Sequence, residues 1–444
     1  MVEKRKVGYI ETLLVNSQKA ANSGTIVTTS DVEGDIDEEL MVSALEVMFE
    51  RHPSLRSTIY WDKDDVFIET NAEFDNIPIT FGERKKGSTE KLIENELKTN
   101  LEPTRYLWRM TILLDRGKRK KKTNTLGFTC HHAVSDGAST CMFIRDLLDV
   151  YETLMRNIDY EEEPLPQLET IEELCNNNKT IEEMQKEREH ITSVKFDNFP
   201  YDKNTPLENR TTKVRLLFLH KEEVEIIHKS CKANKVTINS LLNSAALLSM
   251  SDLFGKEVII PTFTPMSLRS SCIPNLGNEH FGFFVGYAQN NFKVDPKRSD
   301  LFDLAREYQA AFYKEKETQC FFPDKIDKLS TKELITYMED FLPTEEPSFN
   351  SGLCITNLGR YCYRPNLRSH TIKTLNFSVG RAAGDLPFVI QVVTVGGVMN
   401  ISIVWADPLM SKEHANQFCE QFISHIENAC DFIHQDNPQN KKAS

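Results

Sequence analysis

The most informative segment of this chain reads Cys130-His131-His132-Ala133-Val134-Ser135-Asp136-Gly137. Apolar residues precede it from Leu126 onward, and large apolar residues such as Phe143 and Leu147 recur after it at a spacing of three to four. The first pattern is typical of a buried strand, and the second of a helix with one apolar face. We therefore predict a strand that ends at two histidines, a short turn, and a helix that runs to about Met155.

A histidine at a strand end is a natural general base. Its pKa lies near working pH, and the strand fixes its position. Successive strand residues point to opposite faces, so only one histidine of the pair can face a given cleft. We assign that place to His132 and a structural role to His131. With no side-chain nucleophile identified beside it, the base would act on a bound substrate.

Four other interpretations compete at this point. The simplest is a buried, hydrogen-bonded histidine pair at a domain boundary. A metal site would use His132 and Asp136, but Gly137 and the preceding strand disfavour the helix that this spacing needs, and no third ligand is near. A Cys130–His132 pair would sit roughly 7 Å apart on one strand face, too far for direct activation. A serine hydrolase would need a G-x-S-x-G turn, and none is present.

Composition narrows the function further. The chain has 444 residues and a formal net charge of -13, which argues against nucleic-acid binding. Its ten cysteines are scattered, as in a cytoplasmic protein with reduced thiols. No apolar signal core follows the N-terminus, and no apolar run approaches the roughly 20 residues that span a bilayer, so we expect no membrane insertion. The basic run 118–122 is predicted to be a solvated hairpin turn.

Both halves of the chain mix strands and helices, which predicts two α/β sandwich-like domains. Residues 1–160 would form an N-terminal subdomain, 161–212 a polar, proline-containing crossover linker with a short helix near 180–189, and 213–444 a C-terminal subdomain. The expected strands are 24–32, 55–60, 66–70, 108–114, 126–132, 213–219, 257–264, 283–290, 352–358, 371–379, 388–395 and 398–405, and the expected helices are 37–50, 137–155, 222–229, 237–253 and 412–433.

His131-His132-x-x-x-Asp136-Gly137 resembles the HHxxxDG motif of the CoA-dependent acyltransferase superfamily, which includes condensation domains, alcohol acetyltransferases and polyketide-associated acyltransferases. Other segments in the same order support the resemblance from about residue 8 to 405. They are Gly8-Tyr9-Ile10-Glu11, Arg51-His52-Pro53-Ser54-Leu55-Arg56, Pro265-Met266-Ser267-Leu268-Arg269, Phe281-Gly282-Phe283-Phe284-Val285-Gly286 and Ile355-Thr356-Asn357-Leu358-Gly359. The plant-type DFGWG signature is absent.

The resemblance implies two chloramphenicol-acetyltransferase-like α/β sandwich domains that form a pseudo-dimer with an interdomain tunnel. In this arrangement His132 takes a proton from an alcohol or amine acceptor. Asp136 holds the loop through a salt bridge to Arg56, and the Gly137 N–H helps stabilise the oxyanion. The tunnel lining would include Asn357, Phe283 and Phe284.

The same resemblance implies neither a metal nor a redox cofactor. Acyl-CoA is the simplest thioester donor, because no carrier or adenylation segment is evident in the sequence, and an acyl-carrier protein is the alternative. We expect a monomeric enzyme. The rival functions are a non-catalytic binding or scaffold protein that keeps the fold, and a thioesterase.

Overall fold

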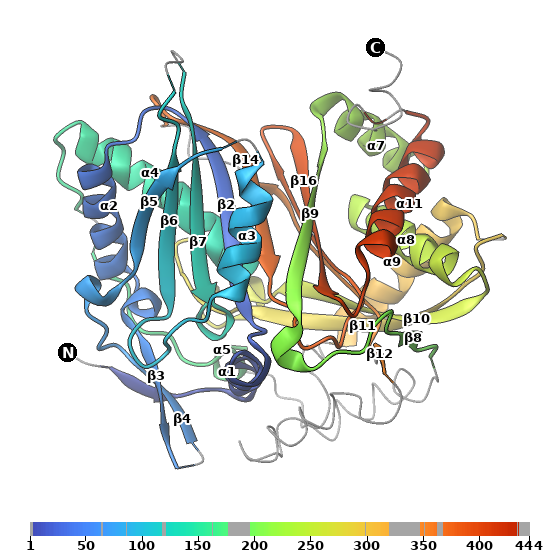
Figure 1. Cartoon of the computed structure of the whole chain (residues 1–444), viewed down its shortest axis with the longest axis horizontal. Helices are drawn as coiled ribbons and strands as arrows, with labels where there is room; N and C mark the ends of the chain where they lie inside the picture. Colours follow the sequence, from blue (N-terminus) through green and yellow to red (C-terminus); the bar gives the residue numbers. More distant parts are fainter. Residues whose placement is uncertain are drawn as a thin grey trace.

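The computed structural model describes residues 3–63, 65–85, 87–117, 121–161, 163–175, 196–297, 299–318, 347–349, 351–361, 367–432 and 434. They form two lobes whose sheets diverge from a shared seam (Figure 1). Most expected elements are present within a few residues of their expected bounds. The short helix expected near 180–189 and part of the basic run 118–122 lie outside the described residues.

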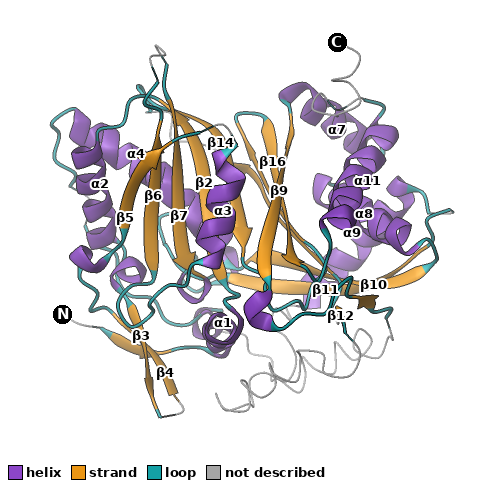
Figure 2. Ribbon diagram, in the orientation of Figure 1, coloured by secondary structure: helices purple, strands orange, loops and turns teal. Residues whose placement is uncertain are grey.

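The first lobe is built on a sheet with the strand order β14-β2-β7-β6-β5 among the described residues. One face of this sheet is covered by α4, and α2 packs against α4. The other face is covered by α3 and by the second lobe (Figure 2). Because both faces are covered, β2 and β7 are apolar or small almost throughout and nearly fully buried. The elements are β1 (Lys4–Lys6), α1 (Tyr9–Ala21), β2 (Thr25–Glu33), α2 (Glu38–Arg51), η1 (Pro53–Arg56), β3 (Thr58–Asp62), β4 (Asp65–Glu69), η2 (Phe74–Asn76), β5 (Ile79–Glu83), α3 (Ser88–Lys98), β6 (Trp108–Leu114), β7 (Thr123–His131), η3 (His132–Val134) and α4 (Gly137–Met155).

The second lobe has the strand order β11-β10-β13-β15-β16-β9 within its described part. One face is covered by α8, which packs against α9 and α11, and the other meets the first lobe. The elements from the crossover onward are α5 (Ile171–Leu174), β8 (Phe199–Pro200), η4 (Leu207–Asn209), β9 (Thr211–Leu219), α7 (Lys221–Ala233), α8 (Ile238–Phe254), β10 (Val258–Ser267), η5 (Arg269–Ser271), β11 (Val285–Val294), α9 (Leu301–Thr318), β12 (Ser348–Phe349), β13 (Leu353–Tyr361), β14 (Thr371–Val379), β15 (Val389–Val395), β16 (Val398–Asp407) and α11 (Lys412–Cys430).

The strand β14 corrects the predicted domain division. It was expected with the rest of 213–444 in the C-terminal subdomain, but it pairs antiparallel with β2 and completes the sheet of the first lobe. Alternation of apolar and polar residues specifies which face of a strand is buried, but not the sheet that the strand joins. The second half of the chain therefore contributes directly to the first lobe.

Polar and apolar contacts hold the two lobes together. Helix α3 lies between the sheets, and two of its carboxylates accept backbone N–H groups of the edge strand β9: Glu90 from Leu216 at 2.9 Å and Glu94 from Val214 at 3.4 Å. Deeper in the seam, Val27 of β2 packs in one apolar cluster with residues of β9, β13, β15 and β16. A strand edge satisfied by carboxylates and a buried apolar contact fix the lobes relative to each other.

Candidate active site

His132 stands where the central strand of the first lobe turns into a helix. β7 ends at His131, η3 begins at His132, and Asp136 caps the N-terminus of α4 by accepting the Ser139 N–H at 2.7 Å. The His132 N–H donates to Gly24 O at 2.8 Å, so the turn remains tied to the end of β2. The site is thus carried on a short, fixed connection.

The ring of His132 is oriented by one hydrogen bond. Its Nδ1 lies 2.8 Å from Ser135 O, which accepts hydrogen bonds only, so Nδ1 must carry the proton. In the neutral ring this leaves Nε2 as the acceptor. Burial lowers the pKa of His132, and the positive charge of Arg381 lowers it further. The hydrogen bond to the Ser135 carbonyl has the opposite effect and raises it. The residue as a whole keeps some accessible surface. A neutral, accessible Nε2 is what a general base needs.

His131 is held differently from its neighbour. It is fully buried, its Nδ1 accepts the Ala133 N–H at 3.1 Å, and its carbonyl accepts the Ser135 hydroxyl at 3.0 Å. Burial, together with the nearby His132, lowers its pKa to about 3. These contacts support the turn, and they suit a histidine that stays neutral.

The buried histidines predict acid sensitivity. Burial also lowers the pKa of His52 to about 3. Both His52 and His131 therefore have folded-state pKa values below the unfolded value of 6.5, so their contribution to stability is complete above pH 6.5 and is lost as pH falls below it. The free energy of unfolding should drop by up to about 2.7 kcal/mol per pH unit between about pH 6 and 4. Urea unfolding across this range measures the slope. A His52→Gln variant should show about half of it, and stability that rises on acidification would contradict the assignment.

Asp136 makes an ion pair that differs from the expected one. Its partner is Arg269, with guanidinium-to-carboxylate distances of 3.0 and 3.4 Å, and the two side chains are 1% and 7% exposed. Asp136 also accepts the Phe284 N–H at 3.1 Å, and Arg269 donates to the Ser139 hydroxyl at 2.7 Å. The pair therefore fastens a loop of the second half of the chain onto the start of α4.

The prediction that Arg56 pairs with Asp136 is wrong. Arg56 ends η1, and within the described part of the chain no ion pair joins it to Asp136. It is half-buried, and its carbonyl accepts the Ala72 N–H at 2.9 Å. Motif order placed Arg56 upstream of the histidines, but the carboxylate of Asp136 faces η5 (Arg269–Ser271). Arg269 also stood in a segment singled out in the sequence, but the sequence held no signal that favoured it over Arg56.

Gly137 is required by close packing. A Cβ at this position would lie 2.6 Å from the ring of Phe377, which belongs to β14. Nothing in the contacts assigns its N–H to an oxyanion, and that role stays a prediction.

We expect Gly137→Ala to lower the free energy of unfolding by about 1–3 kcal/mol, because either the Phe377 ring or the first turn of α4 must shift. Chemical denaturation measures the loss. A Gly137→Ala/Phe377→Leu double variant provides the control, since relief of the clash should make the two changes less than additive. Strict additivity would exclude the contact as the cause.

The three residues predicted to line a tunnel have different surroundings. The ring of Phe283 meets the His132 ring edge-on with centroids 5.5 Å apart, so it borders the imidazole. Phe284 instead packs beneath the Arg269 guanidinium, 4.6 Å from its ring centroid. Asn357 accepts the Gly359 N–H at 2.8 Å and shares a strand face with Ile355 of the second-lobe core. For Asn357 a local structural role replaces the predicted one, because a strand face is fixed by register.

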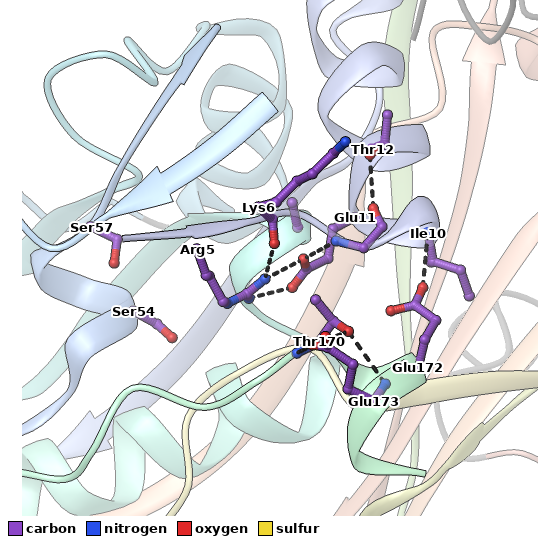
Figure 3. Close-up of polar contacts among 12 residues, drawn as sticks. Arg5, Lys6, Ile10, Glu11, Thr12, Ser54, Ser57, Thr170, Glu172 and Glu173 are labelled. Carbon is purple, nitrogen blue, oxygen red and sulfur yellow. Dashed lines mark hydrogen bonds and ion pairs between the residues drawn. The ribbon is translucent and has the colours of Figure 1, made fainter. Parts of the chain in front are cut away.

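Figure 3 shows the polar contacts that hold the start of α1. Glu11, the third residue of α1, accepts the Gly8 N–H at 2.8 Å and pairs with Arg5 through two contacts of 2.6 Å. Glu172 of α5 accepts the Ile10 N–H at 3.2 Å, and a side chain on Gly8 would collide with the Glu172 carboxylate. Because α1 contacts η3, this network fixes the position of the helix that packs against the His132 turn.

The described structure has a small cavity near the turn and a larger one far from it. A cavity of about 30 Å³ lies against Ala133 and Val134, between His52 and Phe283. A larger one, about 1020 Å³, lies near Asn124 at the other end of the nine-residue β7, about 26 Å from the histidines. Among the described residues, no group of three or more His, Cys, Asp or Glu is placed to hold a metal ion. No helix in that part of the chain is long and apolar enough to cross a bilayer.

Burial excludes Cys130 as the alternative nucleophile. The Cys130 side chain packs into the core of the first lobe, and burial raises the pKa of its thiol to about 12. A thiol of that pKa is protonated at neutral pH and is a poor nucleophile. Cys130 is therefore excluded as a nucleophile, and the site keeps a neutral imidazole whose Nε2 is a hydrogen-bond acceptor.

Comparison with known proteins identifies a family for this chain. A family model described as "Condensation domain" matches residues 16–441. Bacitracin synthase 1 of Bacillus licheniformis is 22% identical over 415 residues, which cover 90% of this chain and 7% of that protein. The chain spans less than a tenth of the length of the curated relatives it matches.

Solved structures of similar fold cover nearly the whole chain. The trichothecene 15-O-acetyltransferase of Fusarium sporotrichioides aligns with a TM-score of 0.76 at 12% identity, over 97% of this chain and 96% of that one. The polyketide synthase associated protein 5 of Mycobacterium tuberculosis aligns with a TM-score of 0.69 at 16% identity, over 96% and 97%. These likenesses confirm the predicted two-lobe α/β fold. The family match over residues 16–441 shows that the chain belongs to the condensation-domain family, whose general chemistry is acyl transfer.

Proposed function

We propose that this protein transfers an acyl group from a thioester donor to a hydroxyl or amine acceptor, with His132 as the general base. The observation that carries the proposal is the hydrogen bond from His132 Nδ1 to Ser135 O, which directs the unprotonated Nε2 away from the turn. The simplest donor is acyl-CoA, and an acyl-carrier protein is the second candidate. The site would work without a metal or redox cofactor.

The chemistry follows from that tautomer. Nε2 accepts the proton of the acceptor as its oxygen or nitrogen attacks the thioester carbonyl. The C–S bond then breaks, and the imidazolium returns the proton to the leaving thiolate, so that a thiol and an ester or amide are released. The oxyanion formed in between lies near the N-terminus of α4, where the Gly137 N–H and the helix dipole would stabilise it.

The surrounding network supports a site of fixed geometry. Asp136 and Arg269 bind the loops of both halves to the first turn of α4, and His131 holds the backbone beneath His132. Phe283 lies against the imidazole and shields it from bulk water, which favours the neutral form of the ring. This architecture suits transfer to a bound acceptor more than transfer to water.

The test measures thiol release and product mass together. The protein is incubated with acetyl-, hexanoyl- and palmitoyl-CoA, or the same acyl groups on a carrier protein, with and without a panel of alcohols and amines. Release that requires an acceptor and gives an acylated product supports transfer. Thiol release without any acceptor indicates a thioesterase. Absence of release across both donor classes supports the non-catalytic binding protein and contradicts the proposal.

A further inference from the structure

The charge of Arg381 acts on His132, but Arg381 takes no part in the proposed proton transfer. Arg381 follows β14, and the preceding Gly380 donates its N–H to Thr25 O at 2.9 Å. Thr25 is also the cross-strand partner of His131. Arg381 and His132 therefore leave the same end of the first sheet, on either side of β2.

The backbone of Arg381 is held by a hydrogen bond, but its guanidinium lacks close hydrogen-bond partners among the described residues. Its N–H donates to Thr212 Oγ1 at 2.8 Å, which ties the loop to β9. The ion pair recorded for the side chain, to Asp385, spans 3.7 Å, beyond hydrogen-bond distance. Its Nε is buried and has no hydrogen-bond partner among the described residues. A guanidinium offers five N–H donors, so this one has capacity to spare.

The opposite wall comes from the second lobe. Tyr287 of β11 pairs with Pro265 of β10, and Phe263, two residues earlier on β10, pairs with Cys354. Cys354 packs in the same apolar cluster as Val27 of the first lobe. Alternate strand residues share a face, so Tyr287 stands on the face of the second sheet that meets the first lobe.

The electrostatics of these groups agree with that placement. The charge of Arg381 adds to burial in lowering the pKa of His132. Burial raises the pKa of Tyr287 to about 12, although the positive charge of Arg381 acts in the opposite direction. Tyr287 therefore stays protonated and able to donate. His132, Arg381 and Tyr287 are each partly accessible although they belong to the interior of the molecule.

We propose that Arg381, with Tyr287 on the facing wall, binds a carboxylate carried by one of the two substrates. The inference rests on the proposed acyl transfer. A planar guanidinium with free N–H groups pairs with a carboxylate through two parallel hydrogen bonds, and such a pair fixes orientation as well as position. A substrate carboxylate held there would replace the long contact to Asp385 and would direct the reacting end of the molecule toward His132. Arg381 is thus a specificity residue that exchanges no proton.

The carboxylate can belong to the acceptor or to the acyl group of the donor, and matched substrates distinguish the two. One arm offers acetyl-CoA with 3-hydroxybenzoate or its methyl ester, and with 3-aminobenzoate or its methyl ester. The other arm offers succinyl-CoA or butyryl-CoA with the neutral esters as acceptors. In each arm the quantity measured is the ratio of kcat/KM for the acid to that for its uncharged counterpart, in wild type, Arg381→Gln and Arg381→Lys.

We expect wild type to prefer the acid in one arm and Arg381→Gln to reduce that preference about 100-fold, the effect of losing two charge-assisted hydrogen bonds. Arg381→Lys should retain part of it, because the charge remains while the fork is lost. Arg306→Gln, which changes an exposed arginine of α9 in the second lobe, serves as the matched control and should keep the wild-type ratio.

The outcomes separate this inference from the proposed function. Turnover of uncharged substrates with no preference for an acid in either arm, or a preference that Arg381→Gln retains, would overturn the inference and leave acyl transfer standing. A raised KM for acetyl-CoA itself with neutral acceptors would assign Arg381 to the CoA phosphates and would also overturn it. Loss of all turnover in wild type would remove both. Thermal melting of each variant shows whether the loop is still folded.

Discussion

His132→Ala is expected to lower acceptor-dependent thiol release by about 10²- to 10⁴-fold, the usual contribution of a positioned general base. The loss should fall on kcat, because the ring acts on the proton as the acceptor attacks and supplies little of the binding surface. His132→Gln should be equally impaired, since an amide of similar size cannot take the proton. The measurement is steady-state release of the free thiol, with product identified by mass.

Two controls make that result specific. The melting temperature of His132→Ala should stay close to that of wild type, because the imidazole makes one hydrogen bond, to the carbonyl of Ser135 in its own turn. The exposed His414→Ala, which loses only a surface contact with Asp202, should keep full activity. A folded His132→Ala protein that turns over near the wild-type rate would falsify the general-base assignment.

Arg269→Ala is expected to destabilise the protein by about 3–5 kcal/mol, because it leaves the Asp136 carboxylate buried without its counter-charge. Asp136→Ala should be similarly costly, since it also removes the cap of α4. Activity should fall with both changes as the His132 turn loosens. Equilibrium denaturation with urea measures the stability loss, and circular dichroism shows whether the remaining protein is folded.

Arg56→Ala is the matched control for that experiment. It removes the arginine of the other motif segment, which makes no ion pair with Asp136 among the described residues, and we expect it to cost no more than about 1 kcal/mol. The Arg269→Ala/Asp136→Ala double variant should lose much less than the sum of the single losses, because neither charge is then left unpaired. A larger loss from Arg56→Ala than from Arg269→Ala would contradict the ion pair described here.

Elements with strong local signals were predictable from sequence. Their apolar periods and turn residues indicate the type of element without knowledge of the rest of the fold. The elements whose bounds agree closely with expectation are β6, β7, α4, β14 and the hairpin β15–β16. The strand that leads to the two histidines followed in the same way, although β7 ends at His131 and His132 begins η3 instead of ending the strand. The two-lobe fold followed from the resemblance and is supported by the family match.

Pairings between distant segments could not be predicted in the same way. The strand β14 carries a clear apolar alternation, but nothing within it specifies β2 as its partner. Asp136 required an arginine, and both Arg56 and Arg269 were available in the sequence. Only the tertiary arrangement, in which the Phe284 N–H and the Arg269 guanidinium meet the same carboxylate, decides between them.

The central claim concerns the protonation state of one ring, and NMR of the ¹⁵N-labelled histidine side chains measures it. Long-range ¹H–¹⁵N spectra of wild type, with the His132→Ala spectrum used to assign the signal, should show at pH 7 a neutral His132 protonated on Nδ1, whose Nε2 shifts when an acceptor is added. A ring that is charged at pH 7, or that carries its single proton on Nε2, would contradict the account.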